Sequence, residues 1–200
     1  MEYWNDLITE RSFEVLQKIK KEFKFILIGG WATYLYSKTL KSRDIDIIMD
    51  YKELEKIKLN YNLKKNENLR KYEIIIDGIE IDIYVAFYSN LTIPLDKIST
   101  KSIESFNVIN IEELIILKQG ALLDRGESEK GFKDKIDILS LLFNCDINFD
   151  KYKEILKNNK KDYFLKNLIS LVKNFKEYKY FYKNPREFKL NKEKVLKIIG

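Results

Sequence analysis

The sequence predicts an α+β protein, in which a domain with a mixed α/β sheet is followed by a helical domain. Two observations support this prediction. Short apolar or alternating segments typical of strands lie before about residue 109, and apolar residues at helical spacing dominate residues 110–200. With 45% hydrophobic residues, a chain of 200 residues can bury one sizeable core and a smaller second one. We therefore expect two domains, at residues 1–109 and 110–200.

The first expected elements are a helix, a strand and a second helix. Residues 11–22 carry apolar side chains at helical spacing, residues 25–28 form an apolar run typical of a buried strand, and residues 31–36 suit a helix. Gly29 and Gly30 lie at the junction, where backbone N–H groups can approach a phosphate near the positive end of the helix dipole. The junction is a candidate phosphate-binding turn, although glycine there also suits a tight turn without a ligand.

Two carboxylates follow on the next expected strand. Asp44 and Asp46 alternate with Ile45 and Ile47, so strand geometry puts both carboxylates on one face and the isoleucines in the core. Adjacent carboxylates repel each other unless a cation lies between them, and Mg²⁺ prefers oxygen ligands that it shares with substrate phosphates. The pair is a candidate site for Mg²⁺, or for Mn²⁺ in its place. The alternative is a solvated strand face without a ligand.

A third carboxylate is expected on a β-hairpin. Residues 72–76 and 79–85 are typical strands, and the Asp-Gly pair at 77–78 is a strong signal for a tight turn. In the second strand, Glu80 and Asp82 share the face opposite the isoleucines. We choose Asp82 as the carboxylate that joins the pair.

The second half is expected to be helical, and its C-terminal part is strongly basic. Residues 151–200 hold fifteen Lys or Arg against five Asp or Glu. Lysines and aromatic residues interleave at residues 175–183, which suits either RNA binding or a lysine-rich helical bundle with an aromatic core. We expect Pro185 to mark a break before the last helix. The expected helices span residues 111–123, 133–143, 152–158, 162–175 and 192–199.

The order of strand, Gly-Gly, helix, Asp-x-Asp strand and later Asp strand resembles the DNA polymerase beta-type nucleotidyltransferase superfamily over residues 20–90. Lys118 and the segment that holds Asp134 and Asp137 extend the resemblance to about residue 145, where it is similar to the AbiEii-like, toxin-type branch. An arginine that is frequent four residues before the first Asp of this pattern is replaced by Leu40. The resemblance implies a nucleotidyltransferase fold for the first domain.

The same resemblance implies transfer of a nucleoside monophosphate from an NTP, such as ATP, to an acceptor hydroxyl with the help of Mg²⁺. The most favoured acceptor is RNA at the tRNA 3′ end, with the chain as the toxin of a toxin–antitoxin pair and an antitoxin protein as partner. The alternatives are a protein or small-molecule acceptor, and a non-catalytic relative that binds nucleotide or nucleic acid. The implied residues are Asp44, Asp46 and Asp82 for metal and catalysis, Lys118 for catalysis and nucleotide binding, and Gly29, Gly30, Ser42, Asp134 and Asp137 for nucleotide binding.

Composition excludes other chemistries. The chain has no histidine and one cysteine, Cys145, which excludes Ser-His-Asp hydrolysis, an intrachain disulfide and a cysteine zinc cluster. No apolar run approaches the roughly twenty residues that span a bilayer, and the first residues lack the pattern of a signal peptide. We expect a cytoplasmic protein without membrane contact.

Overall fold

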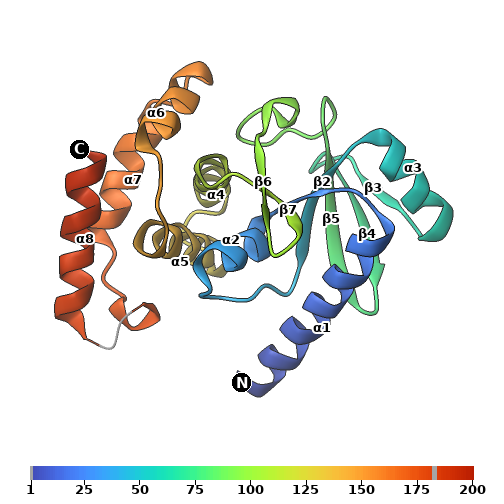
Figure 1. The fold of residues 1–200 in the computed structure, drawn as a ribbon, viewed down its shortest axis with the longest axis horizontal. Helices are drawn as coiled ribbons and strands as arrows, with labels where there is room; N and C mark the ends of the chain where they lie inside the picture. Colours follow the sequence, from blue (N-terminus) through green and yellow to red (C-terminus); the bar gives the residue numbers. More distant parts are fainter. Residues whose placement is uncertain (1, 182–183) are drawn as a thin grey trace. The chain divides into compact units, whose positions relative to one another are not determined.

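The computed structural model describes residues 2–181 and 184–200, with side chains from residue 6 onward (Figure 1). The chain divides into two compact units, Met1–Asn110 and Ile111–Gly200, here called unit 1 and unit 2. Each unit is described by itself. Among the described residues, none of the helices is both long enough and apolar enough to cross a membrane.

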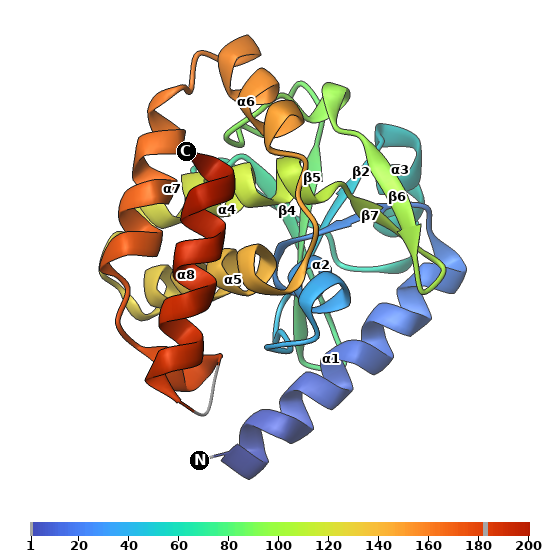
Figure 2. The same ribbon diagram turned by 60° about the vertical axis from the view of Figure 1, so that its left-hand side comes forward.

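Unit 1 is built on a seven-stranded mixed sheet with the strand order β3-β4-β5-β2-β1-β7-β6 (Figures 1 and 2). The pairs β1–β7 and β2–β5 are parallel, and the other pairs are antiparallel. The predicted mixed sheet and the predicted hairpin are therefore confirmed. The strands are β1 (Ile26–Ile28), β2 (Ile45–Met49), β3 (Lys64–Asn66), β4 (Lys71–Ile76), β5 (Ile79–Val85), β6 (Thr100–Ile103) and β7 (Phe106–Ile109).

Helices α1 (Glu2–Glu22) and α2 (Gly29–Ser37) pack together around a buried tryptophan. Trp31 is 1% exposed, its indole N–H donates to the Ser12 hydroxyl at 2.9 Å, and its ring lies 5.1 Å from that of Phe13. Helix α1 contacts β5, and α2 contacts β1 and β2. This packing fixes the start of α2 at the end of β1.

Helix α3 (Tyr51–Asn60) was not expected from the sequence, because its apolar positions are few. Asp50 caps it by accepting from the Glu53 N–H at 2.8 Å. Glu53, 5% exposed, then accepts from the Lys24 N–H at 3.1 Å and from Lys56 Nζ at 2.6 Å. Glu53 therefore ties α3 to the chain just before β1.

We expect Glu53→Gln to lower the free energy of unfolding by about 1 kcal/mol at pH 7, because the charged bond to Lys56 is lost. The hydrogen bond from Lys56, and then that from the Lys24 N–H, lowers the pKa of Glu53. Its stabilising effect is thus present above the unfolded pKa of about 4.3 and is lost as pH falls through the lower folded pKa. Urea unfolding between pH 7 and pH 3.5 should show the deficit of the variant shrinking.

The matched control is Glu55→Gln, because Glu55 pairs with Lys58 at 3.9 Å with both side chains largely exposed. That variant should stay within about 0.5 kcal/mol of the wild type. A deficit of Glu53→Gln that grows as the pH falls would contradict this account of Glu53.

Unit 2 is helical, and three of its helices, at Glu129–Asn144, Phe149–Asn158 and Pro185–Ile199, begin earlier than expected. Helix α5 begins at Glu129 because Ser128 caps it, with its hydroxyl accepting from the Gly131 N–H at 3.1 Å. Interpreting Pro185 as a break was wrong, because Pro185 is the first residue of α8 and follows the N-cap Asn184. The helices are α4 (Ile111–Arg125), α5 (Glu129–Asn144), α6 (Phe149–Asn158), α7 (Tyr163–Asn174) and α8 (Pro185–Ile199).

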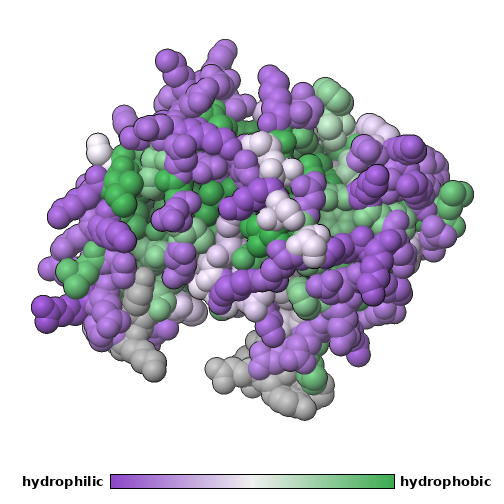
Figure 3. Space-filling model, in the orientation of Figure 1, coloured by the Kyte–Doolittle hydropathy of each residue, from purple (hydrophilic) through white to green (hydrophobic). Residues whose placement is uncertain are grey.

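Some aromatic residues of the basic segment belong to the core of unit 2. Phe175 and Phe188 are 7% and 5% exposed, and their rings belong to a cluster in which Phe181 stacks on Phe188 at 5.9 Å. Tyr180 is half exposed, and residues 182–183 lie outside the described residues. Hydrophilic side chains cover much of the molecular face in Figure 3. The bundle alternative therefore accounts for Phe175 and Phe188, but not for the half-exposed Tyr180.

Candidate functional site

Three carboxylates lie in a row across adjacent strands of unit 1. Asp46 on β2 is the register partner of Asp82 on β5, and Asp82 is in turn the partner of Glu73 on β4. On the other side, Asp46 is the partner of Ile28, the last residue of β1. Neighbouring strands lie about 4.8 Å apart, so register partners present neighbouring side chains on one face. We call Asp46, Asp82 and Glu73 the carboxylate row.

The other two polar residues expected beside Asp46 lie just before β2. Asp44 is exposed in the bend that precedes the strand, so strand alternation does not fix the direction of its side chain. Ser42 is only 3% exposed. The strand begins at Ile45, so only Asp46 of the expected pair is a strand residue. Glu73, which was not expected from the sequence, is the third member of the row.

Gly29 brings the start of α2 against the carboxylate of Asp46. Gly29 has a φ of +65°, and a Cβ atom built there would lie 2.0 Å from Asp46 Oδ2. The N-cap residue Ile28 makes no side-chain capping bond, and the first turn of α2 holds no acidic residue. Gly30 is buried behind it. The N–H groups of this turn and the carboxylate of Asp46 thus lie side by side.

We expect Gly29→Ala to lower the free energy of unfolding by about 2–5 kcal/mol, because alanine adds strain at positive φ and overlaps Asp46. Gly78→Ala is a matched control. Gly78 also has a positive φ, +79°, but an added Cβ would meet nothing within 4 Å. This control should lose only about 1–2 kcal/mol in denaturant unfolding. Equal losses in the two variants would show that the contact with Asp46 does not demand glycine at position 29.

A lysine that sequence reasoning did not single out contacts two members of the row. Lys71 Nζ lies 2.6 Å from Asp82 Oδ2 and 3.1 Å from Glu73 Oε1, and the Lys71 side chain is 13% exposed. Burial lowers the pKa of Lys71, but its bonds to Asp82 and Glu73 outweigh burial and raise the pKa overall. A hydrogen bond from Asn66, followed by that from Lys71, lowers the pKa of Glu73. The alternation of β4 puts residues 71 and 73 on one face, which is the signal that could have revealed the contact.

Unit 2 brings together the other three expected residues. Lys118 on α4 donates to Asp137 Oδ2 at 2.6 Å and to Asp134 Oδ1 at 3.1 Å, both on α5. The three side chains are 9%, 0% and 2% exposed. Arg125 Nη1 reaches Asp134 Oδ2 at 2.6 Å, a contact that sequence reasoning missed. Within the described residues, Asp137 Oδ1 is buried without a hydrogen-bond partner.

The contacts among Lys118, Asp134 and Asp137, here called the Lys118 cluster, suit a structural role, since two buried carboxylates on α5 hold the lysine of α4. The resemblance implies instead that Lys118 donates to a triphosphate. An ammonium group has three N–H donors, and the two aspartates accept from two of those of Lys118. Variants of Lys118 and its two aspartates can distinguish the structural role from the nucleotide-binding role.

The oxygen donors of unit 1 fit a metal ion that arrives with its nucleotide. The described part of the chain contains no group of three or more Asp, Glu, Cys or His residues arranged to hold a metal ion by themselves. Mg²⁺ is usually bound through one or two carboxylates together with substrate phosphates. Asp46, which touches the turn at Gly29, and Asp44 just before its strand supply such carboxylates.

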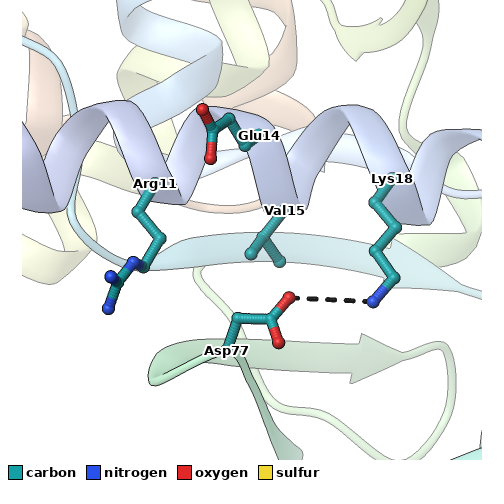
Figure 4. Close-up of a pocket in the computed structure, with 5 residues that line it drawn as sticks. All are labelled: Arg11, Glu14, Val15, Lys18 and Asp77. Atoms are coloured by element: carbon teal, nitrogen blue, oxygen red, sulfur yellow. Dashed lines mark ion pairs between the residues drawn. The ribbon is translucent and has the colours of Figure 1, made fainter.

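Two surface hollows of unit 1 lie elsewhere. One, of about 550 Å³, is lined by Arg11, Glu14, Val15, Lys18 and Asp77, with an exposed Lys18–Asp77 ion pair at 3.7 Å (Figure 4). The other, of about 600 Å³, is lined by residues around Phe23, Met49 and Phe106. Of the described residues that line these two hollows, none belongs to the carboxylate row.

The fold resembles solved structures, although no protein-family model matches the sequence and no curated protein matches it either. The crystal structure of JHP933 from Helicobacter pylori is 19% identical, with a TM-score of 0.54 over 96% of this chain and 91% of that chain. The crystal structure of a "putative nucleotidyltransferase" from H. pylori is also 19% identical, with a TM-score of 0.51 over 96% and 93%. The predicted nucleotidyltransferase fold is thereby confirmed.

Proposed function

We propose that this chain is a nucleotidyltransferase that moves a nucleoside monophosphate from an NTP to an acceptor hydroxyl in the presence of Mg²⁺. The observation that carries the proposal is the contact between Asp46 and Gly29 at the start of α2. A turn that can donate to phosphate and a carboxylate that can bind a cation meet there, in a fold shared with a protein described as a "putative nucleotidyltransferase".

Each residue of unit 1 has a role in this proposal. Asp44 and Asp46 would hold Mg²⁺, or Mn²⁺ in its place, and the bound ion would neutralise charge on the triphosphate. The N–H groups of Gly29 and Gly30 would donate to phosphate oxygens. Asp82 would accept the proton of the acceptor hydroxyl as that oxygen bonds to the α-phosphorus and the bond to pyrophosphate breaks.

The remaining residues enter the proposal through the resemblance to the AbiEii-like branch. Ser42 and Lys118 would donate to the triphosphate, and Asp134 and Asp137 would orient Lys118 or contact the nucleoside. The hydrogen bonds of Asp134 and Asp137 with Lys118 support the proposal that these carboxylates orient the lysine. Their burial supports a structural role equally well.

For the acceptor we propose RNA, with the tRNA 3′ end first and a toxin–antitoxin pair as the setting. The excess of Lys and Arg in residues 151–200 suits a polyanion. A protein or small-molecule acceptor is the second candidate within the same chemistry. A non-catalytic nucleotide-binding protein is the candidate from another class.

The test is to incubate the protein with each α-³²P-labelled NTP, Mg²⁺ and total tRNA, beside a variant in which Asp44 and Asp46 are both alanine. Label on RNA with the wild type alone would establish the proposal and name the nucleotide. Label on added protein or aminoglycoside instead would keep the transfer and replace the acceptor. Absence of label on any acceptor, with NTP binding that is unchanged in the variant, would favour the non-catalytic candidate.

A further inference from the structure

We infer that Lys71 serves as a built-in cation of the carboxylate row, so that its ammonium group takes the place of a divalent ion at Asp82. A metal ion would then bind at Asp44 and Asp46 only. The role of that metal ion rests on the proposed function, whereas the contacts of Lys71 with the carboxylates do not depend on it. Lys71 is thus a positioning residue, which holds Asp82 in place for the acceptor.

The hairpin β4–β5 builds this contact by itself. Lys71 and Glu73 lie on one face of β4, and Asp82 is the register partner of Glu73 on β5. The ammonium lies 2.6 Å from Asp82 Oδ2 and 3.1 Å from Glu73 Oε1. It is held by two carboxylates on two strands, with only 13% of its side chain exposed.

Another ion pair of the same sheet shows the contrast. Lys65 on β3 pairs with Glu67 at 2.8 Å, but these side chains are 47% and 77% exposed. Solvent screens such a pair, and its loss changes little. The pair of Lys71 and Asp82, 13% and 22% exposed, is screened far less. The ammonium of Lys71 therefore sets the charge that any ion near Asp82 encounters.

Electrostatics then decides where a divalent ion can bind. The row brings three carboxylates onto neighbouring strands, and their mutual repulsion is relieved by cations. Lys71 neutralises the end formed by Asp82 and Glu73. A Mg²⁺ ion bonded to Asp82 would lie beside this ammonium and be repelled by it. At the other end of the row, Asp46 has Gly29 as a neighbour rather than Lys71. This end therefore remains suited to a divalent ion.

The experiment measures Mn²⁺ binding by electron paramagnetic resonance, without nucleotide or acceptor. We expect Lys71→Gln to bind Mn²⁺ at least about tenfold more tightly than the wild type, because Asp82 and Glu73 become available to the ion. Lys71→Arg keeps the positive charge and should bind as the wild type does. Lys65→Gln, which breaks the exposed pair, should do the same. Adding Asp82→Asn to Lys71→Gln should cancel the gain.

Binding by folded Lys71→Gln that equals that of the wild type would overturn the inference. Should Lys71→Gln fail to fold, as judged by circular dichroism, Asp82→Asn in the otherwise wild-type chain decides instead. Unchanged Mn²⁺ affinity in that variant supports the inference, since Lys71 already occupies Asp82. A loss of about tenfold or more would show that Asp82 binds the ion and would overturn it.

The two proposals fail separately. A chain that labels no acceptor but shows the tenfold gain in Lys71→Gln would lose the proposed function and keep the role of Lys71 as a resident cation. A chain that transfers nucleotide through Asp46 but shows no gain in Lys71→Gln would keep the function and lose the inference.

Discussion

Replacing Asp46 with asparagine is expected to reduce nucleotidyl transfer by about 10²–10³-fold while the fold stays intact. Asparagine fills nearly the same space against Gly29, but it lacks the charge that a metal ion and its triphosphate require. Removing one carboxylate from the row also relieves repulsion, so the melting temperature should stay the same or rise. Steady-state rates with labelled NTP, together with thermal unfolding, measure both effects.

The matched control for Asp46→Asn is Glu80→Gln. Glu80 is an exposed carboxylate on β5, two residues before Asp82, and the strand alternation puts it on the same face as Asp82. Its loss should change the rate less than about threefold. A wild-type rate in Asp46→Asn would discard the proposed mechanism. A large loss in Glu80→Gln alone would show that Glu80, and not Asp82, is the third carboxylate.

Replacing Lys118 with alanine is expected to destabilise unit 2 by about 3–5 kcal/mol, because Asp134 and Asp137 would be left buried without the ammonium. Guanidinium unfolding followed by circular dichroism measures the loss. Lys130→Ala on the exposed first turn of α5 is the control and should stay within about 0.5 kcal/mol of the wild type. Equal stabilities of the two variants would show that the buried ion pairs contribute nothing.

A triple variant separates the structural from the catalytic role of Lys118. In Lys118→Met with Asp134→Asn and Asp137→Asn, no buried carboxylate is left without the lysine. Arg125 loses the charge of Asp134 but is 44% exposed, so much of the lost stability should return. If this variant folds and still transfers nucleotide at the wild-type rate, Lys118 is structural. A folded variant that transfers at least about tenfold more slowly would give the cluster a role in the reaction.

Sequence reasoning reached the fold of unit 1 through its strongest local signals. The Asp-Gly turn and the alternation of residues 79–85 specify the hairpin β4–β5, and Gly29 marks the end of β1. Strands β3, β6 and β7 went unnoticed. Strands β3 and β6 are short and polar, as edge strands often are, and β7 is apolar but holds only four residues. Local patterns of this kind carry little information about which distant segments pair.

The candidate site shows the same boundary between what the sequence can and cannot predict. Alternation put Asp46 and Asp82 on the exposed faces of their strands, but it could not show that a register makes them partners. The contact of Lys71 with Asp82 depends on the directions of two side chains, which periodicity does not contain. Likewise, the spacing of Asp134 and Asp137 predicts a shared helix face, while their burial around Lys118 depends on how α4 and α5 pack.

The parallel pairing of β1 with β7 has a consequence for synthesis on the ribosome. Strand β1 can pair early with β2, but its other edge pairs through Leu27 with Val108 only after nearly the whole unit has emerged. Meanwhile the apolar strand β1 presents an open edge, which is a template for unwanted pairing between nascent chains. The hairpin β4–β5, whose strands are neighbours in sequence, can form much earlier. Ribosome-bound fragments that end before β7 should therefore aggregate more readily than fragments that include β7.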